Sequence, residues 1–414
     1  MKTLTISKER LKTHIEQLGE IGKTSDNGVQ RLALSKEDRE ATLMVSEWMK
    51  EAGLTVRHDH FGNLIGRKEG QNPSLPPVMI GSHIDSVRNG GKFDGVIGVL
   101  AGIEIVQAIS ESHIVHEHPV EVVAFCEEEG SRFNDGLFGS RGMVGKVRKE
   151  DLQIVDDNYV TRYDALQTFG FGINPDSIDQ SVRKPGDVKQ YFELHIEQGP
   201  FLEKNHYPIG IVSGIAGPSW FKVKLTGEAG HAGTVPMRLR KDPMIGAAEV
   251  IKEVETLCMN DPDAATVGTV GRINAFPGGS NIIPEYVEFS LDVRDIDLER
   301  RNYVIQKVEE KIKQVCKARG LVYEIERNMA ADPVKCSNNL IDSLTATCKD
   351  LGIEAPVMVS GAGHDAMFLA EITEIGMVFV RCRDGISHQP KEWAEIDDIV
   401  LGTNLLYETV LKWI

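Results

Sequence analysis

Short apolar strands that alternate with helices restrict the first half of this chain to few folds. The predicted strands lie at 77–83, 120–125 and 190–199, and the predicted helices lie at about 36–52 and 95–110. Strands that are apolar throughout are buried on both faces, so helices must cover both sides of their sheet. The alternation resumes after residue 330, with a buried strand at 376–382 and a helix from about 395. We therefore predict an α/β fold with a mixed, largely parallel sheet covered by helices.

Residues 213–328 follow a different pattern. Strands are predicted at 220–227, 266–276, 285–294 and 321–327, and helices at 243–258 and 298–319. The order β-α-β-β-α-β is that of a ferredoxin-like split unit. A chain of 414 residues is long enough for two domains. We predict one domain made of 1–212 and 329–414, and an inserted α+β domain at 213–328.

Charge and composition exclude several classes of function. The net charge of −16 argues against a nucleic-acid or anionic-membrane surface, because both need clustered Lys and Arg. The longest apolar stretch, 95–106, is too short to span a bilayer and contains Glu104. The N-terminal residues lack the apolar segment of a secretory signal. The six cysteines are scattered, as in proteins with reduced thiols, so we expect a cytoplasmic protein.

Histidines and carboxylates gather at or just beyond the carboxyl ends of the predicted strands, where sites form in open α/β sheets. Imidazole and carboxylate without cysteine are the ligands of catalytic zinc, manganese or cobalt. Two ions about 3.5–4 Å apart need a bridging carboxylate and terminal ligands on each ion. The residues that would supply these ligands are His83, Asp94, Glu129, His195 and His388. Because buried ionisable groups are costly unless paired or metal-bound, the joint pattern favours a metal site over five unrelated loop residues.

Other motifs carry less weight. The histidine-rich segment 113–118 lies between a helix and a strand at the expected opposite end of the sheet, so we interpret it as a solvated loop. The loop 90–95 lacks the spacing of a phosphate-binding loop. No G-x-S-x-G elbow is present, which argues against a serine hydrolase.

Several motifs together resemble the M20 metallopeptidase superfamily, and within it the amidohydrolases that act on ureido groups. These enzymes are the N-carbamoyl-L-amino-acid hydrolases and the allantoate amidohydrolases. The matching stretches, between residues 81 and 390, are GSHIDSV, NGGKFDG, EEEGSRF, ELHIEQGP, GHAGTVPM, PGGSNIIPE, DVRD, SGAGHDA and GISHQP. HIEQGP separates this branch from the peptidases, which have an acidic ligand where His195 stands. The resemblance implies a zinc-exopeptidase-like catalytic domain and an inserted lid and dimerisation domain.

The resemblance also implies two divalent ions per subunit, Zn²⁺ or Mn²⁺, with Co²⁺ as a further option. It places His83 and His195 on one ion and Glu129 and His388 on the other, with Asp94 bridging them. Asp85 would orient the imidazole of His83. Glu128 would be the general base towards the attacking water.

The substrate-binding residues implied by the resemblance are Gln198, His231, Asn281, Arg294, Gly361, Gly363 and His364. His231 would stabilise the oxyanion from the partner subunit of a homodimer. Simpler interpretations remain open for three of them. His231 could be a polar residue in a glycine-rich turn, Arg294 a surface ion pair in an edge strand, and His364 a cap of the next helix.

Three adjacent glutamates, Glu127, Glu128 and Glu129, follow an apolar strand. Successive residues of a strand point to opposite faces, so Glu128 and Glu129 must lie where the strand gives way to a turn at Gly130. Glu127 has no role in the resemblance, and we expect it to point away from the metals.

Two ureido acids fit as the small substrate. EEEGSRF, GHAGTVPM and SGAGHDAM resemble the allantoate enzymes of purine catabolism, and we favour allantoate, which would yield ureidoglycine, ammonia and CO₂. Pro218 stands where many allantoate enzymes have glutamine, and it favours the alternative, an N-carbamoyl-L-amino-acid hydrolase. An M20-type peptidase is a more remote alternative. A non-catalytic relative would lack a ligand or the base, and all are present.

Overall fold

The structure is a computed structural model, which describes residues 6–261 and 264–414. The chain forms two compact units. The first runs to Ser213 and takes up Cys336–Met358 and His364–Ile414, and the second comprises Gly214–Lys335 and Val359–Gly363.

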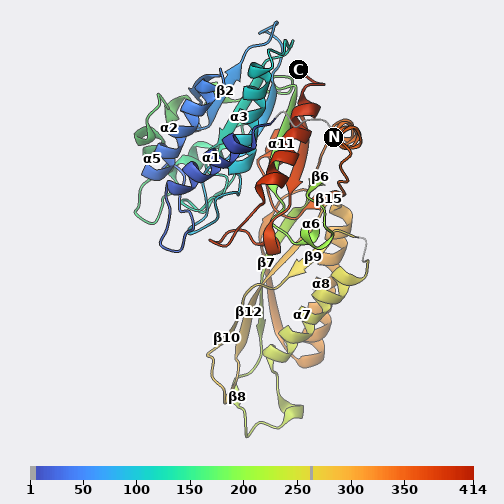
Figure 1. Ribbon diagram of the computed structural model, residues 1–414. Coiled ribbons are helices and arrows are strands. Elements are labelled where there is room, and N and C mark those ends of the chain that lie inside the picture. Colours follow the sequence, from blue (N-terminus) through green and yellow to red (C-terminus); the bar gives the residue numbers. More distant parts are fainter. Residues whose placement is uncertain (1–5, 262–263) are drawn as a thin grey trace. The chain divides into compact units, whose positions relative to one another are not determined.

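A mixed sheet forms the centre of the first unit (Figure 1). Its strands, in spatial order, are β1 (Thr55–His58), β2 (Leu64–Lys68), β4 (Val120–Phe125), β3 (Val78–His83), β5 (Gln190–Ile196), β16 (Glu374–Val380) and β6 (Ile209–Ile215). The short strands β14 (Val334–Lys335) and β15 (Val357–Ser360) both pair with β6. The four strands from β4 to β16 are mutually parallel, and the flanking pairs are antiparallel. The predicted α/β class is confirmed.

Helices cover both faces of this sheet. The principal helices are α1 (Lys8–Glu20), α2 (Lys36–Glu51), α3 (Val96–Glu111), α4 (Phe138–Met143), α5 (Arg162–Phe169), α6 (Phe201–Lys204), α9 (Asn338–Leu351), α10 (Ala366–Leu369) and α11 (Ile396–Val410). Short 3₁₀ helices η1 (Lys149–Gln153), η2 (Pro175–Ser181) and η4 (Arg383–Gly385) lie between them. Figure 1 shows α1, α3 and α11 packed together, and α3 lies against β3, β4 and β5. Because α3 is buried along most of its length, it is apolar on nearly every side.

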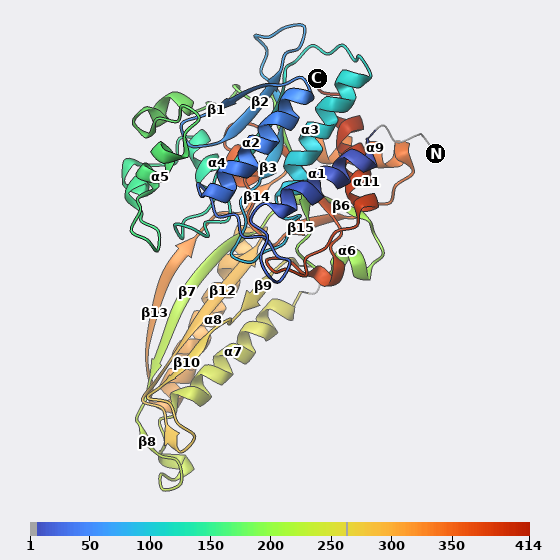
Figure 2. The same ribbon diagram turned by 60° about the vertical axis from the view of Figure 1, so that its left-hand side comes forward.

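The second unit is an antiparallel sheet with two helices (Figure 2). The strands of this sheet are β7 (Gly217–Thr226), β9 (Val267–Thr269), β10 (Ile273–Phe276), β12 (Tyr286–Asp295) and β13 (Val322–Ala330), and the two α-helices are α7 (Pro243–Met259) and α8 (Leu298–Arg319). A separate two-stranded sheet is formed by β8 (Gly230–His231) and β11 (Ile282–Ile283), and a short 3₁₀ helix, η3, spans Met237–Leu239. The order β10-β12-β7-β13 is that of a ferredoxin-like unit. The apolar faces of α7 and α8 form one core with β7 and β12.

Two predictions need correction here. The single strand expected at 266–276 is two strands, because β9 pairs with Asp292–Arg294 of β12 whereas β10 pairs with Tyr286–Phe289. The second unit comprises Gly214–Lys335 and Val359–Gly363, whereas the inserted domain was expected at 213–328.

Three of the predicted helices are present. The helices expected at 36–52, 95–110 and 298–319 are α2, α3 and α8. All six cysteines are free thiols. Among the residues that the structure describes, no helix has the length and apolar character needed to cross a membrane.

Candidate metal centre and active site

Four parallel strands end at the same edge of the larger sheet, and the predicted site residues gather there. β3 ends at His83, and β5 carries His195 as its penultimate residue. β4 runs directly into the three glutamates, and the loop after β16 carries His388. The carboxyl ends of adjacent parallel strands lie side by side, which is why residues from distant parts of the chain meet.

Asp94 lies at the centre of this cluster. Its Oδ1 is 3.1 Å from His195 Nε2 and 3.9 Å from His83 Nε2. Its Oδ2 is 3.2 Å from His388 Nε2, and Glu129 Oε2 is 3.5 Å from the same nitrogen. Asp94 therefore belongs both to a group with His83 and His195 and to a group with Glu129 and His388, in each of which the possible ligand atoms lie within 4.8 Å of one another.

Gly95 makes this arrangement possible. It precedes α3 with a φ of 67°, which favours glycine. A Cβ at this position would lie 2.3 Å from His83 Nε2. The chain thus turns from Asp94 into α3 directly against the imidazole, and a larger residue would displace one of them.

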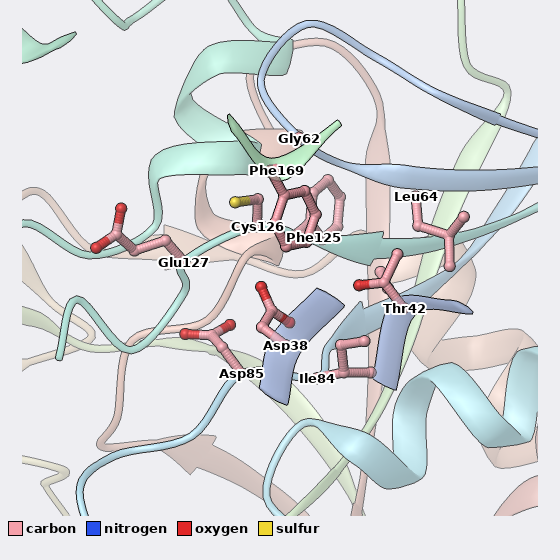
Figure 3. Close-up of a pocket in the computed structure, with 11 residues that line it drawn as sticks. Asp38, Thr42, Gly62, Leu64, Ile84, Asp85, Phe125, Cys126, Glu127 and Phe169 are labelled. Carbon is pink, nitrogen blue, oxygen red and sulfur yellow. The ribbon is translucent and has the colours of Figure 1, made fainter. Parts of the chain in front are cut away.

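Asp85 supports the site differently from the prediction. Its carboxylate lies 3.6 Å from His83 Nδ1, too far for a hydrogen bond, and the Asp85 carbonyl oxygen is the nearer partner at 3.1 Å. The carboxylate instead accepts hydrogen bonds from the backbone N–H groups of Glu128 and Glu129, at 3.2 and 3.3 Å. Figure 3 shows Asp85 beside Asp38 at a cavity of about 10 Å³. Burial raises the pKa of Asp85 to about 7.

The electrostatics of the cluster favour a bound cation. Burial raises the pKa of Glu128 and Glu129 well above the usual range, and neighbouring carboxylates add to the rise. Burial also lowers the pKa of His83 to about 4, so its imidazole is neutral and has a nitrogen lone pair available for a metal ion. Among the ion pairs of the described residues, Asp94 and Glu129 pair with imidazoles and not with Lys or Arg. These nitrogen and oxygen donors fit Zn²⁺, Mn²⁺ or Co²⁺ and would be relieved of mutual repulsion by such an ion.

Comparison with known proteins agrees with this geometry. The model of the peptidase family M20/M25/M40 matches residues 79–412. The chain belongs to this family. It is 81% identical to an N-carbamoyl-L-amino-acid amidohydrolase of Pseudomonas sp. (strain NS671), over the whole of both chains. It is 37% identical to the allantoate deiminase of Arabidopsis thaliana, over 93% of this chain and 79% of that one.

The solved structures agree. A crystal structure of an amidase of the hydantoinase/carbamoylase family from Burkholderia multivorans superposes with a TM-score of 0.94 and 34% identity, covering 99% of this chain and 98% of that one. The predicted resemblance to the ureido amidohydrolase branch of M20 is confirmed, and the chain is a hydrolase.

Glu127 is separate from the groups of possible metal ligands around Asp94, as predicted. Its Oε2 lies 2.9 Å from Arg162 Nε, and its Oε1 accepts a hydrogen bond from the Phe133 N–H. Both members of the ion pair are fully buried. Figure 3 shows the carboxylate directed away from Asp38 and Asp85. Glu127 has a φ of 56°, so the chain leaves the strand direction here and the three glutamates can face different partners.

Replacing Glu127 with alanine should destabilise the fold and leave the metal cluster in place. Arg162 would lose a buried anionic partner, a change that costs about 3–5 kcal/mol. Chemical denaturation should show this fall in the free energy of unfolding, and elemental analysis of the folded fraction should show unchanged metal content. Loss of metal at unchanged stability would contradict the separation of Glu127 from the site.

Gln198 and His364 lie beside the metal cluster in the first unit. Gln198 Nε2 donates to Asp94 Oδ2 at 2.8 Å. The buried ring of His364 stands edge-on to His195, with centroids 4.5 Å apart, and it groups with Glu193 and His195. The helix α10 begins at Asp365 as its N-cap and has no side-chain cap, so the interpretation of His364 as a capping residue is wrong.

The remaining predicted substrate residues lie in the second unit. His231 is in β8, which pairs with β11, and the Asn281 carbonyl accepts from the Ala232 N–H. Arg294 is near the other end of β12, where it bonds Asp292 and the Gly361 carbonyl oxygen, the latter at 2.7 Å. Gly363 ends the short segment that Gly361 belongs to. β12 has neighbours on both sides, so Arg294 does not lie in an edge strand, although the ion pair is real.

His231 and Arg294 are far apart within this unit. Thr226 pairs with Tyr286 and Pro218 pairs with Arg294, and β8 follows β7 beyond Thr226 (Figure 2). Strand geometry puts the two ends of this register roughly 27 Å apart. One copy of the second unit therefore cannot place His231 and Arg294 on the same small molecule.

The histidine-rich segment 113–118 precedes β4 and so lies at the opposite end of the strand from the glutamates, as predicted. It joins no metal-ligand group among the described residues. The expectation of a solvated loop is wrong for His116, which is buried with its Nδ1 2.7 Å from the His118 carbonyl oxygen.

Sequence reasoning missed three residues around the site. Glu392 and Ser387 contact the Asp94 loop, and Arg162 neutralises Glu127. The only signal for the first two was their position within four residues of His388, and no local pattern pointed to Arg162.

Proposed function

We propose that this protein hydrolyses the ureido C–N bond of N-carbamoyl-L-amino acids, releasing the amino acid, ammonia and CO₂. The observation that carries the proposal is the identity along the whole chain to the Pseudomonas amidohydrolase of that name. The allantoate deiminases are much more distant, so allantoate, which the motifs favoured, becomes the second candidate. Pro218 supports the same choice, because an apolar residue at this position cannot hydrogen-bond a second ureido group.

The ligand set supports two divalent ions. His83 and His195 would hold one and Glu129 and His388 the other, with Asp94 between them, in line with the two groups that share Asp94. When bound, such an ion would lower the pKa of a water molecule to about 7 and so supply a nucleophile at neutral pH.

Glu128 is the proposed general base. It is grouped with His83 and Glu129 but, unlike Glu129, it is not paired with His388. The Asp85 carboxylate holds the N–H groups of both glutamates and so fixes the turn that presents them. Glu128 would accept the proton of the attacking water and deliver it to the departing amine.

The second unit would hold the substrate. The planar fork of Arg294 fits the substrate carboxylate, and Asn281 would add a hydrogen bond. His231 would donate to the developing oxyanion. Because His231 and Arg294 are so far apart in one copy, we propose a homodimer in which His231 serves the site of the partner subunit.

A substrate panel tests the proposal. After loading with Mn²⁺ or Zn²⁺, we expect ammonia release from N-carbamoyl-L-amino acids to exceed that from allantoate by about tenfold or more, a discrimination that a few pocket contacts provide. Removal of the ions with a chelator should abolish turnover, and their return should restore it. Faster turnover of allantoate would reverse the choice of substrate, and turnover of neither by metal-loaded protein would refute the ureido proposal.

A further inference from the structure

Glu392 joins the two loops that carry Asp94 and His388. Its Oε1 accepts hydrogen bonds from the backbone N–H groups of Phe93 and Asp94, at 2.9 and 3.1 Å. Its Oε2 accepts from the Ser387 hydroxyl at 3.0 Å. Glu392 is only 3% exposed. Its three hydrogen-bond donors are Asp94 itself, Phe93 directly before Asp94, and Ser387 directly before His388.

The loop before Asp94 is shaped around this carboxylate. A Cβ on Gly91 would lie 2.0 Å from Glu392 Oε1, a distance that no side chain could tolerate. Gly91 does not have a positive φ, so close approach and not backbone conformation is the reason for glycine here. The spacing of NGGKFDG thus leaves room for Glu392 as well as for His83.

Ser387 extends the connection to the side chain of Asp94. Its hydroxyl oxygen lies 2.8 Å from Asp94 Oδ2 and 3.0 Å from Glu392 Oε2. A hydroxyl has one hydrogen, so it donates to one of these carboxylates at a time and can turn to Glu392 when Asp94 is otherwise engaged. Ser387 is also the residue directly before His388.

His388 needs such support more than the other candidate ligands. Its side chain is 50% exposed, whereas those of His83 and His195 are 1% and 2% exposed. Packing therefore holds the two buried imidazoles, whereas the position of His388 depends on its loop and on contacts with Gln198, Asp94 and Glu129. Ser387 and Glu392 connect that loop by hydrogen bonds to the Asp94 loop, although Ser387 and Asp94 are 293 residues apart in the sequence.

We propose that Glu392 and Ser387 are positioning residues that hold Asp94 and His388 at ligand distance and so set the affinity for a divalent ion at Glu129 and His388. This rests on the metal centre of the proposed function. Partners that orient ligands in this way typically contribute 10–100-fold in metal affinity.

The test measures affinity for Zn²⁺ and Mn²⁺ by chelator competition in the full-length protein, with thermal unfolding of the metal-free form alongside. Ser387→Ala should lower the affinity for one of the two ions by about 10-fold or more. The unfolding temperature should change little, because Ser387 is only partly buried. Glu392→Ala should lower the affinity for this ion further. Glu392→Gln should bind more tightly than Glu392→Ala, because its amide oxygen can still accept from Phe93 and Asp94 while its NH₂ donates to Ser387.

A matched control is Ser110→Ala, which removes a partly buried hydroxyl that bonds the Ala52 and Val106 carbonyl oxygens. It should leave metal affinity unchanged. In Co²⁺-loaded protein, Ser387→Ala should also change the visible absorption spectrum, which a general loss of stability would not do.

Wild-type affinity for both ions in Ser387→Ala, with an unchanged Co²⁺ spectrum, would overturn the inference even if Glu392→Ala fails to fold. A wild-type protein that binds no divalent ion would instead refute the metal centre of the proposed function, and the inference with it. The wild-type titration therefore separates the two failures.

Discussion

Replacing Glu128 with glutamine is expected to abolish turnover while both metal ions stay bound. Glutamine keeps the size of the side chain but cannot accept the proton of the attacking water. General acid–base groups contribute typically 10²–10⁴ in rate, so kcat should fall by about that factor. Metal content by elemental analysis and the unfolding temperature should match the wild type, because the backbone bonds to Asp85 do not involve the Glu128 side chain.

Glu129→Gln is the matched comparison, since it changes the neighbouring residue in the same way. Glu129 Oε2 faces His388 and groups with Asp94, so this variant should lose an ion as well as activity. If Glu128→Gln loses the ion and Glu129→Gln keeps it, the two glutamates have exchanged roles. Near wild-type kcat in Glu128→Gln would exclude it as the base.

Replacing His231 with alanine should lower kcat by about 10²–10³, the usual effect of removing one oxyanion donor. Activity should return when the His231→Ala and Glu128→Gln subunits form one dimer. If His231 acts across the interface, one of the two sites in such a heterodimer has both an intact Glu128 and an intact His231. Doubly tagged heterodimers, purified through both tags after co-expression, should then have about half of the wild-type activity by symmetry.

Each other outcome has a definite meaning. Heterodimers without activity would show that His231 acts within its own subunit. Failure to recover any doubly tagged species would contradict the homodimer. Tagged dimers that carry His231→Ala in both subunits are the control and should stay inactive.

The substrate shows where motif likeness misleads. EEEGSRF and SGAGHDAM contain Glu128, Glu129 and His364, which belong to the groups of possible metal ligands, so these motifs indicate the kind of chemistry more than the substrate. Pro218 lies in β7 of the second unit, and it was the one residue that favoured the carbamoyl amino acid. The identity along the whole chain to the Pseudomonas N-carbamoyl-L-amino-acid amidohydrolase agrees with the indication from Pro218 and not with that from the motifs.

The sequence by itself determined the elements of this protein and the kind of chemistry at their ends. The hydrophobic periodicity of a segment is a local property of its sequence, so α2, α3, α8 and the parallel strands could be predicted. Because these strands are parallel, the meeting of His83, His195 and His388 at one edge of the sheet could be predicted as well. The strand 266–276 was not, because its division depends on which part of β12 each half pairs with.

Only the tertiary structure decided how the site is held. The partner of Glu127 lies 35 residues away, and Glu392 meets Phe93 across 299 residues. The Asp85 carboxylate turned out to hold the glutamate turn and not the imidazole. Such bonds depend on where packing places separate loops, and a hydrogen bond requires placement to within tenths of an ångström, which no local pattern in the sequence specifies.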